Sequence, residues 1–241
     1  MSAFEIARGW RVQRFGRKGP HEILDALVEP LWDGPRVIVA VERGQAAVFH
    51  EGTRLSGPPD IVALLAAAAA PGTELVAEGC LTPQALRTGE GAMLDSGEAA
   101  PSMRTRMFGT MGGGKRDAML RQKEEEQRLE KRDAEVVSGA GGPLALVATD
   151  LLWIDGDELL AVPLLERKRL LESALDESEL IRISAYIRPS ATGSIMGWRS
   201  LGFQTLAYKS ANGRYHPGEE NEGWAAVPVP GSNMPITTGQ R

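Results

Sequence analysis

A short stretch near the N-terminus, residues 28–36, carries the side chains best suited to chemistry. It reads Val-Glu-Pro-Leu-Trp-Asp-Gly-Pro-Arg, so Glu29, Asp33 and Arg36 lie within eight residues of one another. Asp33-Gly34 is a strong turn signal, and the proline that follows reinforces it. Taken alone, the stretch predicts an ordinary tight turn between two strands, with Arg36 paired to a nearby acid.

Other charged residues of interest lie on predicted strands or strand ends. Taken singly, Glu78 is typical of a surface strand residue and Lys209 of a solvated strand end. Asp150 belongs to the same group because it lies in an apolar run that predicts a buried strand. His50 and His216 are isolated and lack the spacing of metal ligands, so no metal site is predicted.

Composition limits the classes of protein. The 241 residues are 42% hydrophobic, enough for a real core, and the net charge of −5 argues against a strongly basic nucleic-acid binder. A single cysteine, Cys80, excludes an internal disulfide framework and favours a reducing compartment. No apolar run approaches the roughly 18 residues of a membrane helix, and the N-terminus lacks a signal-peptide core. We therefore expect a cytoplasmic protein without a membrane partner.

The pattern around these residues predicts strands interspersed with helices. Residues 23–27 look helical, 37–49 form a hairpin, 60–70 form a helix capped by Asp60, and 74–79 form a strand. Further along, strands are predicted at 144–152, 180–187, 203–209 and 224–229, with a short helix at 195–201. Residues 163–175 predict an amphipathic helix that faces the core with leucines and places Glu166, Arg167, Lys168 and Arg169 outside.

Composition also divides the chain. Residues 1–20 form a basic N-terminal arm, either a solvated lead-in or a phosphate-contacting patch, and 21–229 form the main domain. Within that domain we expect an insertion at 88–142, with a loop at 88–114 and an exposed, charged helix at 115–136 that suits contact with a protein. Residues 230–241 are expected to be a flexible tail.

Read with later stretches, residues 29–36 resemble the nucleotide-attachment motif of ATP-dependent DNA ligases, Glu-Pro-Lys-aromatic-Asp-Gly-x-Arg. The residues that match are Glu29, Pro30, Trp32, Asp33, Gly34 and Arg36. The nucleophilic lysine of that family is replaced by Leu31.

Later stretches follow in the order of that family. Leu-Val-Ala-Glu at 75–78 resembles Leu-Asp-Gly-Glu, whose glutamate binds the ribose, and Thr-Asp-Leu-Leu-Trp at 149–153 resembles Phe-Asp-Leu-Leu-Tyr. The other similar stretches are 163–171, 202–209 and 215–218 followed by Trp224.

The resemblance implies an α+β, ATP-grasp-like adenylation-domain fold, with two mainly antiparallel sheets flanked by helices and a groove between them. It also implies that remnants of a nucleotide pocket converge on that groove. These remnants are Trp32, Asp33, Gly34, Arg36, Glu78, Asp150 and Lys209. Leu31 would make the groove apolar and fill space that a phosphate needs.

The departures from the family fall on catalytic groups. Its reaction starts when a lysine amine attacks the α-phosphate of ATP, and cations carry the developing charge. The altered positions are Leu31 for the nucleophile, His50-Glu51 for a basic motif, Thr149 for an adenine-packing aromatic, Gln204 and Thr205 for a Glu-Gly pair, and Ala226 and Pro228 for two lysines. The covalent route is absent without a substitute nucleophile.

Three functions remain open at this point. The first is a degenerate ligase-like domain that serves DNA repair as a binding or scaffolding module, with DNA ends or a repair protein as partner. The second is an active, divergent DNA ligase or nucleotidyltransferase that uses ATP and Mg²⁺ and takes Lys18 or Lys209 as nucleophile. The third is a structural or regulatory protein without a nucleic-acid role, which the acidic net charge favours.

Overall fold

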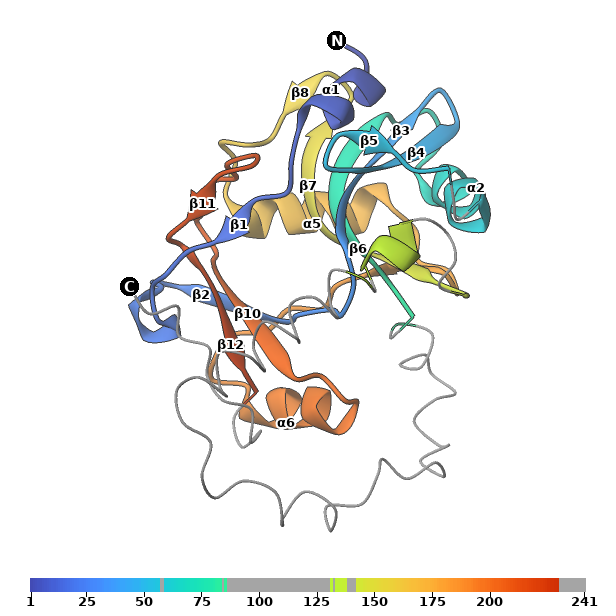
Figure 1. Cartoon of the computed structure of the whole chain (residues 1–241). Coiled ribbons are helices and arrows are strands. Elements are labelled where there is room, and N and C mark those ends of the chain that lie inside the picture. The colour runs from blue at the N-terminus through green and yellow to red at the C-terminus, as the bar shows by residue number, and fades with distance from the viewer. Residues whose placement is uncertain (57–58, 84, 86–130, 132, 138–141, 230–241) are drawn as a thin grey trace.

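The structure is a computed structural model and describes residues 1–56, 59–83, 85, 131, 133–137 and 142–229 (Figure 1). The expectations for residues 88–114, for most of 115–136 and for 230–241 lie outside this part of the chain. Residues 133–137 are helical, and Val136 is buried against the main core.

A seven-stranded sheet forms the larger half of the molecule, in the order β5-β4-β3-β6-β7-β8, with β9 beside β7. Its strands are β3 (Arg36–Glu42), β4 (Gln45–His50), β5 (Thr53–Arg54), β6 (Leu75–Thr82), β7 (Ala145–Ile154), β8 (Asp157–Glu158) and β9 (Ile181–Ile183). All neighbours are antiparallel except β7 and β9. The predicted hairpin is confirmed as β3–β4, with Arg43 and Gly44 both at positive φ in the turn.

Helices cover both faces of this sheet. Successive residues of β3 alternate between two cores: Val39 packs with α2 (Pro59–Ala68) and α5 (Leu164–Ala174), whereas Ile38 and Ala40 pack with α1 (Ala3–Gly9). A strand buried on both faces is apolar throughout rather than alternating, which explains the continuous run at 37–41. Ser2 and Glu5 close a capping box at the start of α1, so the first residues pack as a helix and not as a solvated lead-in.

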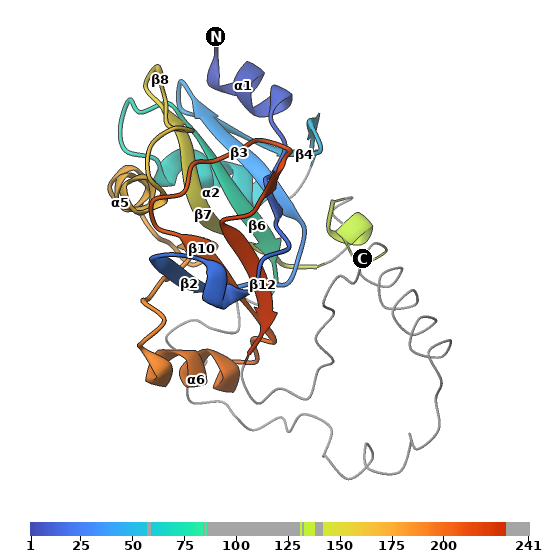
Figure 2. The same ribbon diagram turned by 90° about the vertical axis from the view of Figure 1, so that its left-hand side faces the viewer.

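A smaller antiparallel sheet lies beside the large one (Figure 2). It has the order β12-β10-β2, and α6 covers one side of it (Figure 1). The elements are β2 (Ala26–Pro30), β10 (Thr205–Ser210), β12 (Trp224–Pro228) and α6 (Thr192–Ser200). A two-stranded parallel pair, β1 (Arg14–Phe15) with β11 (Glu220–Asn221), and a short 3₁₀ helix, η1 (Pro20–Glu22), complete the described elements.

The α+β architecture with two mainly antiparallel sheets is therefore confirmed. The chain passes directly from β2 in the small sheet to β3 in the large sheet, so residues 31–35 connect the two (Figure 1). Within the described residues, no helix has the length and apolar character needed to cross a membrane.

Several local predictions are wrong. The helical expectation for 23–27 fails because Ala26 and Leu27 pair with β10 in the small sheet. The strand expected at 180–187 is only β9, although Ile187 bridges back to Val28. Helix α2 begins at Pro59, so Asp60 lies in its first turn and is not its cap.

The predicted outward orientation of Arg167 and Lys168 on α5 is also wrong, and the reason is informative. Arg167 and Lys168, expected outside, are 0% and 1% exposed, whereas Leu170 is 38% exposed. Two buried carboxylates, Asp150 and Glu29, lie under the helix and pair with these cations. Leu164 and Leu171 are buried as expected, and the two ion pairs add Arg167 and Lys168 to the buried face of α5.

Candidate functional site

The link between the two sheets holds the turn of residues 31–35 against the end of β6. The Leu31 amide donates to the Thr205 carbonyl at 3.0 Å, which extends the pairing of β2 with β10. A Cβ on Gly34 would lie 2.0 Å from the Leu81 carbonyl oxygen, so only glycine fits this close approach. The Asp33 carbonyl accepts from the Thr82 hydroxyl at 2.7 Å, while the Asp33 side chain is exposed. Asp33 and Gly34 thus shape the turn.

Trp32 projects from this turn into the space between the sheets. Its indole N–H donates to Ser184 Oγ at 3.1 Å, and its ring meets Phe203 edge-on at 4.8 Å. Trp32 also packs against Ala85 and Val147. Both sheets therefore hold Trp32 in one orientation.

A small cavity of about 20 Å³ lies beside Trp32, between the two sheets. It is lined by Phe15, Glu29, Pro30, Leu31, Trp32, Arg36, Glu78, Cys80, Thr149, Ala207 and Lys209. A site of roughly 10–15 Å³ holds one water, whereas pockets for larger ligands measure about 300–1,000 Å³. This cavity therefore has room for about one water molecule and not for a ligand of nucleotide size.

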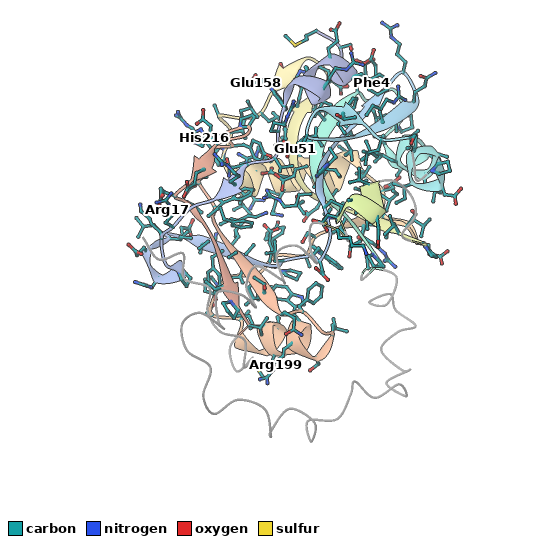
Figure 3. All side chains as sticks on the ribbon, in the orientation of Figure 1. Phe4, Arg17, Glu51, Glu158, Arg199 and His216 are labelled. Carbon is teal, nitrogen blue, oxygen red and sulfur yellow. The ribbon has the colours of Figure 1, made fainter. Side chains whose placement is uncertain are left out.

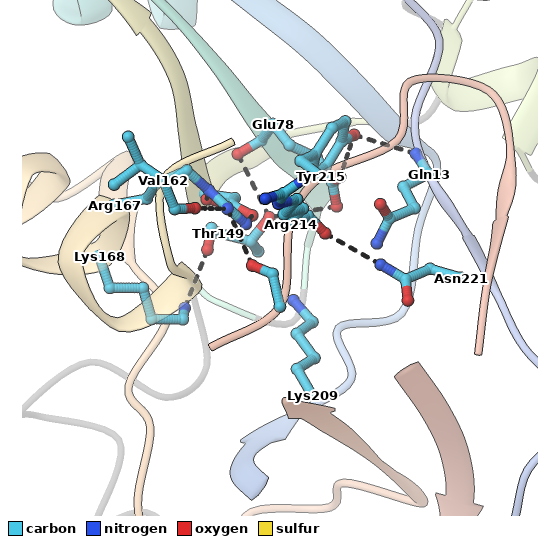
Figure 4. A network of polar contacts seen from close by, with 12 residues as sticks. Gln13, Glu78, Thr149, Val162, Arg167, Lys168, Lys209, Arg214, Tyr215 and Asn221 are labelled. Atoms are coloured by element: carbon cyan, nitrogen blue, oxygen red, sulfur yellow. Dashed lines mark hydrogen bonds and ion pairs between the residues drawn. The ribbon is translucent and has the colours of Figure 1, made fainter. Parts of the chain in front are cut away.

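Arg36 and Glu78 form an ion pair across neighbouring strands at the cavity. Arg36 Nη2 and Nε lie 2.7 and 3.1 Å from Glu78 Oε1. The Tyr215 hydroxyl donates to Glu78 Oε2 at 2.6 Å, and Figure 4 labels both of these residues. Burial works to raise the pKa of Glu78, but the charges of Arg36 and Lys209 outweigh it, so this pKa lies below its ordinary value of 4.5. Burial likewise opposes the charge on Arg36, yet Glu78 keeps the Arg36 pKa raised.

A second buried centre joins the small sheet to α5 through the carboxylate of Glu29. Lys209 Nζ lies 3.1 Å from Glu29 Oε2, and Lys168 Nζ lies 3.0 Å from Glu29 Oε1. Lys168 also donates to the Thr149 carbonyl at 2.8 Å, and Lys209 lies 4.2 Å from the Trp224 ring centroid. Burial lowers the pKa of Lys168, although Glu29 acts in the opposite direction.

Asp150 lies opposite Glu78 in the β6–β7 pairing but makes a separate ion pair. Arg167 Nε and Nη2 bind its two oxygens at 2.8 and 2.7 Å, and both side chains are 0% exposed. Arg167 also donates to the Val162 carbonyl (Figure 4) and to the Gly213 carbonyl. Asp150 is therefore engaged by α5 and does not line the cavity.

The predicted site residues thus divide into two groups. Trp32, Arg36, Glu78 and Lys209 lie together at the cavity with Leu31, whereas Asp33, Gly34 and Asp150 lie outside its lining. Sequence reasoning missed Phe15, Glu29, Arg167, Lys168 and Tyr215. All of these except Phe15 stand in stretches that match the ligase motifs, and that match could have marked them as site residues. Phe15 lies outside every matched stretch.

The donor set gives no support for a metal centre. Among the described residues, no three His, Cys, Asp or Glu side chains are grouped to hold a metal ion. Cys80 lines the cavity, and burial raises the pKa of its thiol, so the thiol stays protonated at neutral pH.

Known DNA ligases resemble this chain in part of its sequence and in its fold. No protein-family model matches the chain. A segment of 89 residues is 32% identical to a DNA ligase of Thermococcus fumicolans, and it makes up 35% of this chain and 16% of the ligase. A DNA ligase of Archaeoglobus fulgidus is 33% identical over 89 residues, with the same two shares.

Solved structures extend the likeness to nearly the whole chain. The ligase domain of LigD from M. tuberculosis superposes with a TM-score of 0.58 at 16% identity, over 92% of this chain and 60% of that one. Mycobacterial DNA ligase D complexed with ATP and MES gives a TM-score of 0.57 at 17% identity, over 91% of this chain and 60% of that one. The chain therefore has the fold of an ATP-dependent DNA ligase adenylation domain, and the predicted resemblance is confirmed.

Proposed function

We propose that this DNA ligase-like domain does not adenylate itself and acts in the cytoplasm as a binding or scaffolding module in DNA repair. One observation carries the proposal: Leu31 replaces the nucleophile, beside a cavity of only about 20 Å³ that internal ion pairs border. Mycobacterial ligase D, which has the same fold, is complexed with ATP. A nucleotide would need far more room than this cavity offers.

The active alternative needs a substitute nucleophile, and the candidate amines do not suit that role. A lysine must be unprotonated and free to attack. Lys209 Nζ is not free to attack, because it pairs with Glu29 Oε2 at 3.1 Å. Lys18 is exposed and does not line the cavity, and Lys168 lies outside the lining and is bound to Glu29 and Thr149. ATP and Mg²⁺ would be cofactors only under this alternative.

Opening the cavity for a nucleotide would also break buried ion pairs. Separating Arg36 from Glu78, or Glu29 from its lysines, leaves charges without partners in a region of low dielectric. Such a cost is of the order of 3–5 kcal/mol for one fully buried pair, and it is smaller for Arg36 with Glu78 because the Arg36 side chain is 20% exposed. The ligand would have to supply this energy before any net affinity appeared.

Calorimetry with Mg-ATP on the natural protein tests the closed site. We expect no measurable heat of binding at protein concentrations that would detect micromolar affinity. Incubation with α-labelled ATP should leave the protein unlabelled, with an active DNA ligase as positive control. Micromolar binding would refute the blocked site, and a stable labelled protein would establish the active alternative.

The variant Leu31→Lys tests whether the missing nucleophile is the only defect. We expect no labelling, because Thr149, Gln204, Ala226 and Pro228 still lack the aromatic, the carboxylate and the two cations. Leu31→Met, which keeps an apolar side chain of similar volume, is the matched control for folding. Efficient labelling of Leu31→Lys would show that the other losses matter little.

DNA ends or a repair protein are the proposed partners. The DNA ligase relatives support the first, and the exposed arm residues Arg14, Arg17 and Lys18 supply cations for phosphate contacts. Binding to a nicked duplex at several salt concentrations separates the two, because phosphate contacts give a steep salt slope. Absence of DNA binding at low salt would favour a protein partner or the alternative without a nucleic-acid role.

A further inference from the structure

The outer face of the small sheet, which points away from the cavity, carries a larger hollow. Successive strand residues point to opposite faces, so Lys209 lines the cavity between the sheets, whereas Tyr208 points outward. Helix α6 covers part of this outer face, where Ile195 packs with Val28 and Leu206. The part around Tyr208 forms an open groove of about 500 Å³.

This hollow, named here the outer groove, has walls from two distant parts of the chain. Residues 20–25, which contain η1, contribute one wall, and Arg188 and Pro189 contribute the other. Ala26 and Tyr208 of the small sheet form the floor. Most of the lining is apolar, and an exposed apolar hollow of this kind marks an interaction surface.

A leucine projects beside the outer groove. Leu24 stands in the chain between two lining residues, Ile23 and Asp25, but does not line the groove itself, and it is 83% exposed. The other exposed leucine among the described residues, Leu170 on α5, is only 38% exposed. Scattered apolar residues are common on protein surfaces, whereas Leu24 continues an apolar groove and forms one patch with it.

The turn that carries Leu24 is held in place, although its backbone is strained. Asp25 has a φ of 50°, in the left-handed region that non-glycine residues rarely adopt. Its carboxylate pairs with Arg188 and accepts from the Asn212 amide group at 3.3 Å. Its carbonyl accepts from the Ala211 backbone amide at 3.0 Å. Leu24 is therefore presented to solvent by a turn that is fixed through both side chain and backbone.

The charges around the outer groove are mixed in sign. Arg188 and Asp25 form their ion pair at the groove with 47% and 51% of their side chains exposed. Arg17 lies at the surface just before the groove segment (Figure 3), and Glu22 is exposed within that segment. A two-fold axis places a patch against its own copy. A patch of one sign would repel itself, whereas a patch with both signs can be complementary to its copy.

We infer that the outer groove is a self-association surface, in which Leu24 of one copy inserts into the outer groove of a second copy. The patch itself specifies this occupant, because the projecting side chain and the hollow lie next to each other on one face. In a two-fold dimer each copy gives one leucine and receives one. Two joined copies would present two identical partner sites, which strengthens the binding of a bivalent partner.

This association goes beyond the proposed function and does not depend on it, since the outer groove and the cavity lie on opposite faces of the small sheet. Sedimentation equilibrium of the full chain, from low to high micromolar concentration, measures the association directly. The natural protein should change reversibly from the mass of one chain to the mass of two. A competing protein partner for the groove would leave the natural protein monomeric in this measurement.

Two leucine variants test whether the contact is at Leu24. Leu24→Arg should weaken the dimer roughly 100-fold, because it buries an unpaired charge in each groove. Leu170→Arg is the matched control, since it makes the same change at an exposed leucine on α5, outside the groove. It should keep the natural dissociation constant. Urea unfolding of each variant checks that these surface changes leave the fold intact.

A mixture of complementary variants tests which residues meet. Pro189 is an exposed wall residue of the outer groove, so Pro189→Glu adds a carboxylate where Leu24 of the second copy should lie. Alone, this variant should weaken the dimer by about ten-fold or more. Mixed in equal amounts, Leu24→Arg and Pro189→Glu should associate to within about ten-fold of the natural affinity, because one contact gains an ion pair and the other is unchanged.

Three results would overturn the inference. The first is a natural protein that stays monomeric at the highest concentration. The second is a dimer that Leu170→Arg weakens as much as Leu24→Arg does. The third is a mixture of Leu24→Arg and Pro189→Glu that stays monomeric while the natural protein dimerises, since the two residues would then not meet. None of these results bears on self-adenylation, which labelling with ATP measures separately.

Discussion

Two buried carboxylates face each other across β6 and β7 but belong to different regions of the molecule. Asp150 gives both oxygens to Arg167, and the pair is fully enclosed under α5. Glu78 lies at the cavity and shares its oxygens among Arg36, Tyr215 and Thr149, with 20% of the Arg36 side chain exposed. One carboxylate therefore stabilises the fold, and the other fills the space where the sheets meet.

Irregular strand pairing explains how neighbours acquire such different surroundings. The register of β6 against β7 shifts between Val76 and Ala77 and again between Glu78 and Gly79. Such irregularities bend a strand and redirect its side chains. Both extra residues, Leu152 and Thr149, lie in β7 on either side of Leu151 and Asp150, so the irregularity redirects the side chains of β7, whereas β6 keeps its regular alternation.

We expect the largest loss of stability when the enclosed ion pair of Asp150 and Arg167 is broken. Asp150→Ala leaves the Arg167 charge buried without its partner, and we expect a loss of about 3–5 kcal/mol in the free energy of unfolding. Urea unfolding monitored by tryptophan fluorescence measures it. The double variant Asp150→Leu with Arg167→Met, which removes both charges, should recover much of the loss. A loss below about 1 kcal/mol would mean that the pair is not structural.

A smaller effect is expected at the cavity. Glu78→Gln still accepts from Tyr215, and water can reach part of Arg36, so we expect a loss of about 1–3 kcal/mol at neutral pH. The folded-state pKa of Glu78 lies below its ordinary value of 4.5. Its contribution is therefore complete above that value and is lost as the pH falls through the folded-state pKa.

Urea unfolding between pH 7 and pH 3 measures this dependence. The natural protein should lose stability over the acidic part of the range more steeply than Glu78→Gln. Glu166→Gln is the matched control, because Glu166 forms an exposed pair with Arg169, and it should keep the natural slope. Equal slopes for the natural protein and Glu78→Gln would contradict the assigned direction of the pKa shift.

The same contrast separates what the sequence could predict from what it could not. The buried strands were predictable because their apolar runs are continuous, and the motif order was enough to bring Trp32, Arg36, Glu78 and Lys209 together. The burial of Lys168 on α5 was not predictable, because Lys168 pairs with Glu29, which lies far away in the sequence. Phe15 was missed because no local pattern marks a residue whose neighbours come from Arg36 and Trp224.

The smallest expected effect concerns Thr149, which stands next to Asp150 in the chain but bonds to Glu78. Its hydroxyl lies 3.3 Å from Glu78 Oε1 and 3.2 Å from the Glu78 carbonyl oxygen. Thr149→Val removes these long hydrogen bonds and keeps the shape, so we expect a loss of about 0.5–1.5 kcal/mol. Lys168 bonds to the Thr149 backbone and should remain in place.

A double-mutant cycle measures whether the Thr149 side chain is coupled to Glu78 or to the ion pair of Asp150. The effect of Thr149→Val should shrink when Glu78 is already Gln, because the two residues interact directly. Thr82→Val is the control: its hydroxyl bonds to the Asp33 carbonyl near the other end of β6, so its effect should be the same with Glu or Gln at position 78. If Thr149→Val coupled to Arg167→Met and not to Glu78→Gln, Thr149 would belong with the enclosed pair, and the division between the two carboxylates would be wrong.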